Sequence, residues 1–151
     1  MKLFSAFLIF YTFIMSNVFA ESSASLHKKI INDIKEHRVN SGHIISLEKL
    51  CLKGYKASCY SVVINSDEMS FEDRYSRLSK ICSPSMGFAC LSLFRLLEKK
   101  AHEETLYNIS PELMSKLSHQ AKRFDDMCSS NDELECIYTE SLKFIISSSQ
   151  V

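Results

Sequence analysis

The chain has 151 residues, with 18 basic side chains against 18 acidic ones, six cysteines, three glycines and two prolines. Because these charges balance, the composition lacks the net positive charge that is typical of proteins that bind nucleic acid or an anionic membrane surface. A β-sandwich would need more turn residues, so the composition favours an all-α protein.

Residues 1–20 have the pattern of a secretory signal peptide. Lys2 supplies a positive start, residues 3–15 are almost wholly apolar, and small residues precede a cleavage site after Ala20. We expect cleavage to leave 21–151 as a single disulfide-stabilised helical domain with 17 basic and 18 acidic side chains. A retained anchor is the alternative, but the apolar run is shorter than the roughly 20 residues that span a membrane. No later stretch has that length, so we expect a soluble mature chain, periplasmic or secreted.

Helical signals then follow along the mature chain. Leu26, Ile30 and Ile34 form one stripe of a first helix, predicted at about 24–40 and ending near Gly42. The other predicted helices lie at 43–53, 59–68, 71–82, 87–105, 111–128 and 132–147. They group into three hairpin units, around 43–68, 71–105 and 111–147.

Helix-capping residues support several of these boundaries. Ser70 stands three residues before Asp73, and Ser130 stands three residues before Glu133, as in a capping box. Ser110 precedes Pro111, which suits the first position of a helix.

The cysteines indicate an internal repeat. They form three pairs with one C-x7-C spacing: Cys51/Cys59, Cys82/Cys90 and Cys128/Cys136. Apolar residues recur four and one positions before each first cysteine: Leu47 and Leu50, Leu78 and Ile81, Phe124 and Met127. Turn-forming residues lie between the two cysteines of each pair, namely Gly54, Pro84 and the segment 129–132. We therefore predict repeated helical hairpins, arranged as a short solenoid or an irregular bundle.

Local disulfide pairing is the favoured interpretation of this spacing. An exported chain with an even number of cysteines is typical of a disulfide framework. A tight helical hairpin can bring residues i and i+8 within the Cα separation of about 5.5 Å that a disulfide needs. Zinc is the alternative, although it favours shorter cysteine spacings or nearby histidines.

These cysteine hairpins resemble the secreted, cysteine-rich branch of the Sel-one-like repeat proteins, which are related to the tetratricopeptide repeats. The resemblance is carried by Cys51 to Cys59 and by the helix from Phe71 to Cys82, while the family's glycines after the second cysteine are missing. It implies α/α hairpins whose helices are bridged around a turn, and a scaffold that binds proteins or peptides. It also suggests an enzyme acting on cell-wall or β-lactam compounds.

Candidates for catalysis are weak. Ser25 with Lys28 and Ser46 with Lys49 match the S-x-x-K pattern of a serine nucleophile, but such matches arise by chance in a serine-rich chain. The histidines are scattered, at His27, His37, His43, His102 and His119. No glycine-rich phosphate loop or calcium loop is present. We therefore assign no catalytic, cofactor or metal-binding residue.

The function favoured by these features is an exported, non-catalytic protein-binding module. It could be a bacterial envelope adaptor, or an immunity-type inhibitor that blocks a toxin or a wall-cleaving enzyme. The alternatives are the hydrolase and a structural or host-directed factor. Aromatic residues are the candidate contacts because they are enriched at interfaces, but none ranks above the others: Tyr55, Tyr60, Tyr75, Phe88, Tyr107 and Tyr138.

Overall fold

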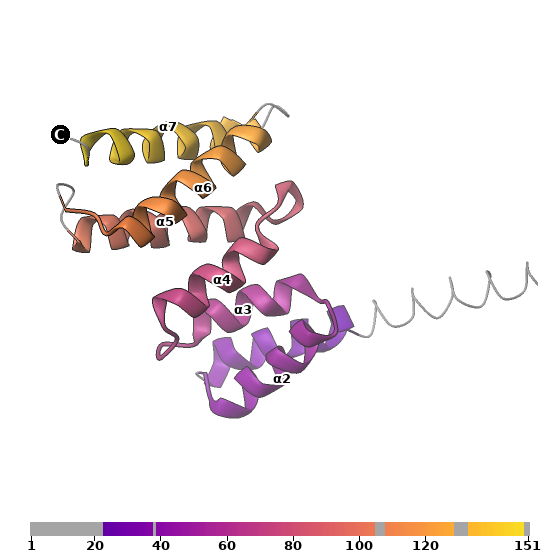
Figure 1. The fold of residues 1–151 in the computed structure, drawn as a ribbon. Helices are drawn as coiled ribbons and strands as arrows, with labels where there is room; N and C mark the ends of the chain where they lie inside the picture. The colour runs from indigo at the N-terminus through magenta and orange to yellow at the C-terminus, as the bar shows by residue number, and fades with distance from the viewer. Residues whose placement is uncertain (1–22, 38, 105–107, 129–132, 150–151) are drawn as a thin grey trace, which may run out of the picture. The chain divides into compact units, whose positions relative to one another are not determined.

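The structure, a computed structural model, describes residues 23–37, 39–104, 108–128 and 133–149. Every regular element among these residues is helical, which confirms the predicted all-α fold (Figure 1). The chain forms two compact units that divide between Glu68 and Met69. The predicted signal peptide, Tyr107 and the predicted turn at 129–132 with its cap Ser130 lie outside the described residues.

The first unit contains three helices. One covers residues 23–37, and it is followed by α2 (Ser41–Leu52) and α3 (Lys56–Asn65). Helices α2 and α3 pack against each other as the first cysteine hairpin. The three helices correspond to the three that the sequence predicts here, with shifted boundaries.

The start of α2 explains one of these shifts. Asn40 is its N-cap: the Asn40 side chain accepts a hydrogen bond of 3.0 Å from the backbone N–H of His43. The His43 ring accepts one of 3.3 Å in return from the N–H of Asn40. This reciprocal cap satisfies two N–H groups that would otherwise lack partners. The preceding helix ends before Val39, so the predicted end near Gly42 is wrong, and Gly42 belongs to the first turn of α2.

The turn between α2 and α3 depends on Gly54. Its φ of 89° lies in the left-handed region, which costs glycine little. The N–H of Gly54 donates to the carbonyl of Cys51 (2.8 Å), and that of Tyr55 donates to the carbonyl of Leu50 (3.1 Å). These two bonds form a Schellman motif, and they let α3 begin at Lys56, three residues earlier than predicted.

The second unit contains two cysteine hairpins. Its helices are α4 (Phe71–Ile81), α5 (Gly87–Glu103), α6 (Pro111–Cys128) and α7 (Glu133–Ser148), with a short 3-10 turn at Pro84–Met86. Helix α4 packs against α5, α6 packs against α7, and α5 also contacts α7 (Figure 1). The second hairpin is therefore joined to the third in part through their second helices.

The predicted capping residues begin α4 and α6. The Ser70 hydroxyl accepts from the N–H of Asp73 at 3.1 Å, and the Ser110 hydroxyl accepts from the N–H of Leu113 at 3.3 Å. Pro111 is the first residue of α6. Because Pro111 lacks an N–H, it leaves no donor without a partner at this position.

All three predicted disulfides are present, at Cys51–Cys59, Cys82–Cys90 and Cys128–Cys136, with Cα separations of 4.6, 4.6 and 4.7 Å. Each bond closes its own hairpin, which confirms local pairing. The apolar residue four positions before each first cysteine is buried, namely Leu47, Leu78 and Phe124. The repeated pattern therefore marks the inner face of the first helix of every hairpin.

Aromatic rings form the core between the second and third hairpins. Phe94 of α5 stacks on Tyr138 of α7 at a centroid distance of 4.8 Å, and Phe124 of α6 meets the same tyrosine edge-on at 5.5 Å. Fully buried leucines surround these rings: Leu93, Leu97, Leu117 and Leu142. This apolar contact fixes α7 against α5 and leaves the opposite side of α7 to solvent.

Candidate interaction surface

The two serine–lysine pairs do not form a catalytic group. Ser25 and Lys28 are both exposed on the helix at 23–37, and no hydrogen bond between them is found among the described residues. The Ser46 hydroxyl donates to the carbonyl of Gly42 at 2.9 Å, while Lys49 is exposed in the last turn of α2. Ser46 therefore acts within its own helix, and its lysine does not contact the hydroxyl.

Two of the scattered histidines meet at one carboxylate in the first unit. Asp33 Oδ2 lies 2.6 Å from His43 Nε2, and Asp33 Oδ1 lies 3.0 Å from His37 Nδ1. Since His43 Nδ1 accepts from the N–H of Asn40, its Nε2 carries the proton that it donates to Asp33. This hydrogen bond is the main reason why the pKa of Asp33 lies below its ordinary value. The contact joins the helix at 23–37 to the N-terminus of α2.

A second histidine contact joins the same helix to α3. His27 Nδ1 lies 2.8 Å from the hydroxyl of Ser58, and the His27 ring meets Tyr55 edge-on. Partial burial lowers the pKa of His27, because desolvation disfavours the charged ring. Ser58 is completely buried, so its hydroxyl is not an accessible nucleophile, and the pair has a structural role.

The cysteines and remaining histidines provide no metal site. All six cysteines are in disulfides, which excludes zinc–thiolate coordination in this state. His102 and His119 are exposed on α5 and α6. Among the described residues, no group of three or more histidine, cysteine, aspartate or glutamate side chains could hold a metal ion.

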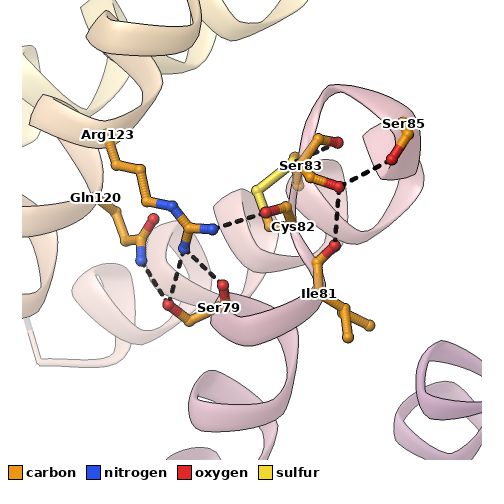
Figure 2. The surroundings of a disulfide bond; sticks show 8 residues. Ser79, Ile81, Cys82, Ser83, Ser85, Gln120 and Arg123 are labelled. Atoms are coloured by element: carbon orange, nitrogen blue, oxygen red, sulfur yellow. Dashed lines mark hydrogen bonds between the residues drawn. A yellow bond between two sulfur atoms is a disulfide. The ribbon is translucent and has the colours of Figure 1, made fainter. Parts of the chain in front are cut away.

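Helices α4 and α6 are joined by polar contacts close to the second disulfide. Arg123 donates to the carbonyls of Ser79 (2.6 Å) and Cys82 (2.7 Å), which lie at the end of α4 (Figure 2). The side-chain amide of Gln120, fully buried, donates to the Ser79 hydroxyl at 2.9 Å. The last carbonyls of a helix lack partners within it, so Arg123 supplies donors that α4 needs and anchors this hairpin to α6.

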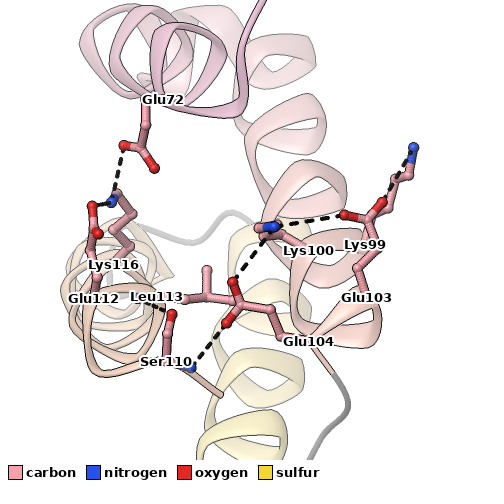
Figure 3. Close-up of polar contacts among 9 residues, drawn as sticks. All are labelled: Glu72, Lys99, Lys100, Glu103, Glu104, Ser110, Glu112, Leu113 and Lys116. Atoms are coloured by element: carbon pink, nitrogen blue, oxygen red, sulfur yellow. Dashed lines mark hydrogen bonds and ion pairs between the residues drawn. The ribbon is translucent and has the colours of Figure 1, made fainter. Parts of the chain in front are cut away.

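A larger charged cluster connects α4, α5 and α6 at their other ends (Figure 3). Lys116 of α6 lies 3.0 Å from Glu72 of α4 and 2.5 Å from Glu112 of its own helix. The hydrogen bond with Glu112 is the first cause of a raised pKa at Lys116. Its ammonium also lies over the rings of Phe71 (5.9 Å) and Tyr75 (5.6 Å), a favourable cation–π arrangement.

The same cluster extends to the connection between α5 and α6. Glu104 accepts a 2.9 Å hydrogen bond from the backbone N–H of Ser110 and lies 3.6 Å from Lys100. The backbone donor is the main cause of the lowered pKa of Glu104. The charges here find partners within the protein, so the cluster is better explained by helix packing than by an external ligand.

A different surface, the outer face of α7, carries apolar side chains that are exposed to solvent. We define this face by Leu134, Ile137 and Phe144, whose exposed fractions are 56, 59 and 69%. Their spacing of three and seven residues places them on one side of the helix. The inner side of α7 carries the buried Tyr138 and Leu142. Helix α7 therefore has two apolar sides, of which only one is covered by described residues.

A groove borders this face where α7 lies beside α5. This α5–α7 groove has a volume of about 420 Å³ and is lined by Glu98, His102, Glu140, Ser141, Phe144 and Ile145. Its lining has two carboxylates, one on each helix, together with the His102 imidazole, while Phe144 and Ile145 supply apolar lining. The groove and the outer face of α7 share Phe144, so they are continuous and form one surface.

The aromatic residues predicted as candidate interface contacts lie in different environments. Tyr138 belongs to the core, Tyr75 to the charged cluster and Tyr55 to the contact with His27. Tyr60 is half-buried in α3. Phe88, at the start of α5, is 75% exposed. Of the described candidates only Phe88 presents a largely exposed ring, and it is not among the residues that line the α5–α7 groove.

Sequence reasoning missed the residues of the α7 surface. In the sequence, Ile137 is the apolar residue after a second cysteine, the position that Tyr60 and Leu91 occupy in the other hairpins. A signal was present: the apolar residues of 133–148 are too numerous for a single helical stripe. The sequence could not show which of two stripes the fold covers.

Comparison with protein-family models, with curated proteins and with solved structures gave no match.

Proposed function

We propose that this protein is an exported, non-catalytic protein-binding module that engages its partner through the outer face of α7. The observation that carries this proposal is the exposure of Leu134, Ile137 and Phe144 on one side of a helix whose other side is already buried. Monomeric soluble proteins rarely expose large contiguous apolar patches. An apolar outer face therefore favours a surface that a partner covers.

The proposed location is the periplasm or the extracellular space of a bacterium. Three intramolecular disulfides indicate an oxidising environment. None of the described helices has both the length and the apolar character needed to cross a membrane. The signal-peptide pattern of residues 1–20 supports export, and an envelope adaptor or immunity-type inhibitor fits this location.

Membership of the cysteine-rich Sel-one-like branch is part of this proposal. Three hairpins with one disulfide each support it, because each bridge joins the helices on either side of a turn. The hydrolase alternative gains no support from Ser25 or Ser46, since neither hydroxyl contacts its lysine among the described residues.

The proposal is tested by affinity capture from an envelope extract, with the mature protein as bait. The informative bait carries Ile137→Ser and Phe144→Ser, which remove two of the three apolar side chains of this face but no buried group. The control bait carries Leu52→Ser, because Leu52 of α2 is 80% exposed but lies in the first unit. We expect one stoichiometric partner with wild type and with the control, and its loss with the double variant.

Helical content and melting temperature of each bait are measured first, so that a loss of capture is not a loss of folding. A partner retained by the folded double variant would contradict the use of α7. If the wild-type protein turned over a chromogenic β-lactam and Ser46→Ala abolished that turnover, the result would contradict the non-catalytic function and support the hydrolase alternative.

A further inference from the structure

We infer that the occupant of the outer face of α7 is a basic amphipathic helix of a partner protein, lying along α7. This inference rests on the proposed function and adds the chemistry of the partner. Apolar side chains of the partner meet Leu134, Ile137 and Phe144. Its lysine or arginine side chains meet Glu98 of α5 and Glu140 of α7.

The spacing of the exposed residues favours a helix as the occupant. Leu134, Ile137, Ser141 and Phe144 follow one another at intervals of three, four and three residues. This is the a/d spacing of a coiled-coil seam, in which each residue packs into a hole on a facing helix. From Leu134 to Phe144 the seam spans ten residue steps of the helix, or about 15 Å of contact length.

Ser141 determines where a large side chain of the partner fits. It is the only small residue of the four and lines the α5–α7 groove together with Phe144 and Ile145. A serine within an apolar seam leaves space that a leucine or phenylalanine of the facing helix can fill. The groove beside Ser141 thus accepts an apolar anchor with carboxylates on either side.

The charges of the groove select a basic partner. Glu98 and Glu140 line it, and none of its described lining residues is a lysine or an arginine. Glu140 is largely exposed, with Lys143 at 3.2 Å, and Lys143 also lies 3.3 Å from Asp125. That lysine is shared between two carboxylates, so negative charge remains to attract cations. Complementary charge beside an apolar centre increases both the association rate and the specificity.

The same charges argue against a second copy of this chain as the occupant. A two-fold contact through α7 uses the same patch on both copies. It would bring the acidic linings of two grooves together, and like charges that face each other destabilise a contact. A different chain with basic residues beside its apolar stripe avoids this repulsion.

The inference is tested with three synthetic helical peptides that share one apolar heptad pattern. Their flanking positions carry lysine, glutamine or glutamate. Binding to the folded mature protein is measured by fluorescence anisotropy at about 50 and about 300 mM salt, where screening differs strongly. We expect the lysine peptide to bind about tenfold more tightly than the glutamine peptide at low salt. The advantage should shrink at high salt.

Matched variants separate the apolar contribution from the charged one. Phe144→Ser should weaken the lysine and glutamine peptides by about tenfold or more, because it removes an apolar contact that both use. Glu98→Gln should weaken only the lysine peptide, by about two- to fivefold. Glu103→Gln is the control, because this α5 carboxylate lies beside Lys99 and Lys100 (Figure 3) and should change neither affinity.

A second control has the opposite charge. Arg95 is exposed on α5 and does not line the groove, so Arg95→Gln should not weaken the lysine peptide. Equal affinity of the lysine and glutamate peptides, or no binding of any peptide, would overturn the inference. A wild-type dimer that Phe144→Ser converts to a monomer would identify a second copy as the occupant instead.

Failure of this inference and failure of the proposed function are distinguishable. If no peptide binds but Ile137→Ser with Phe144→Ser still abolishes capture of the envelope partner, the binding function stands and only the basic helix is refuted. If the peptides bind as expected but that double variant captures the partner normally, the proposed use of α7 in the native complex fails.

Discussion

Single side chains determine how the helix at 23–37 joins the rest of the first unit. Asp33 meets His43 of α2, and His27 meets Ser58 of α3. Both contacts involve an ionisable group, and both pKa values are lowered, at Asp33 mainly by the His43 hydrogen bond and at His27 by burial. The attachment of this helix should therefore weaken in acid.

The Asp33 contact predicts a pH-dependent effect of Asp33→Asn. A carboxyl whose pKa is lower in the folded state stabilises the fold above its unfolded value, near 3.8, and loses this contribution as the pH falls through the folded value. Asp33→Asn should thus lower stability at neutral pH, and its difference from wild type should vanish in strong acid. Urea unfolding at several pH values measures this difference.

The control for that measurement is Glu36→Gln, an exposed carboxylate on the same helix with no ion pair among the described residues. It should leave the pH profile unchanged. If the stability difference between Asp33→Asn and wild type persisted unchanged at a pH below the range in which aspartate titrates, the contact would not depend on the charge of Asp33.

At two glycines, Gly54 and Gly87, we expect substitution by alanine to have opposite effects on stability. Gly54 has φ at 89°, whereas Gly87, at the start of α5, has φ at −51°, and an added Cβ would meet nothing within 4 Å at either position. Gly54→Ala should destabilise by about 1 kcal/mol, because an L-residue is strained in the left-handed region. Gly87→Ala should stabilise by about 0.4–1 kcal/mol by restricting the unfolded chain. Denaturant midpoints report both signs, and a stabilising Gly54→Ala would contradict the turn geometry.

At the scale of elements, the disulfide hairpin is the repeating unit. Each of the three bonds spans eight residues and brings two helices together at their turn. Because the bonds are local, each restricts mainly the unfolded ensemble of its own hairpin. The second hairpin has additional support from Arg123, which binds the carbonyls at the end of α4.

Removal of the second disulfide should therefore act locally. Cys82→Ser combined with Cys90→Ser should cost about 2–3 kcal/mol and preserve most of the helical signal. Hydrogen exchange should increase first in α4 and α5, while the hairpin closed by Cys51–Cys59 should keep its protection. Loss of protection in all helices at once would show that the hairpins do not unfold separately.

At the scale of the whole molecule, the disulfide framework and the predicted export support each other. The bonds need an oxidising compartment, and residues 1–20 have the pattern of a signal that leads there. We predict that the exported product begins at Glu21. Intact-mass measurement under non-reducing conditions checks both the start and the three bonds, because each disulfide removes two hydrogens. Retention of residues 1–20 in a membrane fraction would contradict the prediction.

The sequence by itself determined the all-α class, the helical hairpins and the disulfide pairs. These features depend on residues close together in the chain: cysteines eight residues apart, caps such as Ser70 with Asp73, and a turn at Gly54. Local geometry limits what such neighbours can do, so the pattern predicts the structure. The end of the first helix was misjudged because the reciprocal cap between Asn40 and His43 is an unusual pair.

Tertiary structure alone decided which surfaces are exposed and which distant polar groups meet. Arg123 reaches Ser79 across 44 residues, and no local pattern predicts such a pair. Ile137 follows its cysteine as Leu91 does, yet Leu91 is half-buried and Ile137 is exposed. The physical reason is that burial depends on the neighbour that covers a residue. On the outer face of α7, the described part of the chain supplies no such neighbour.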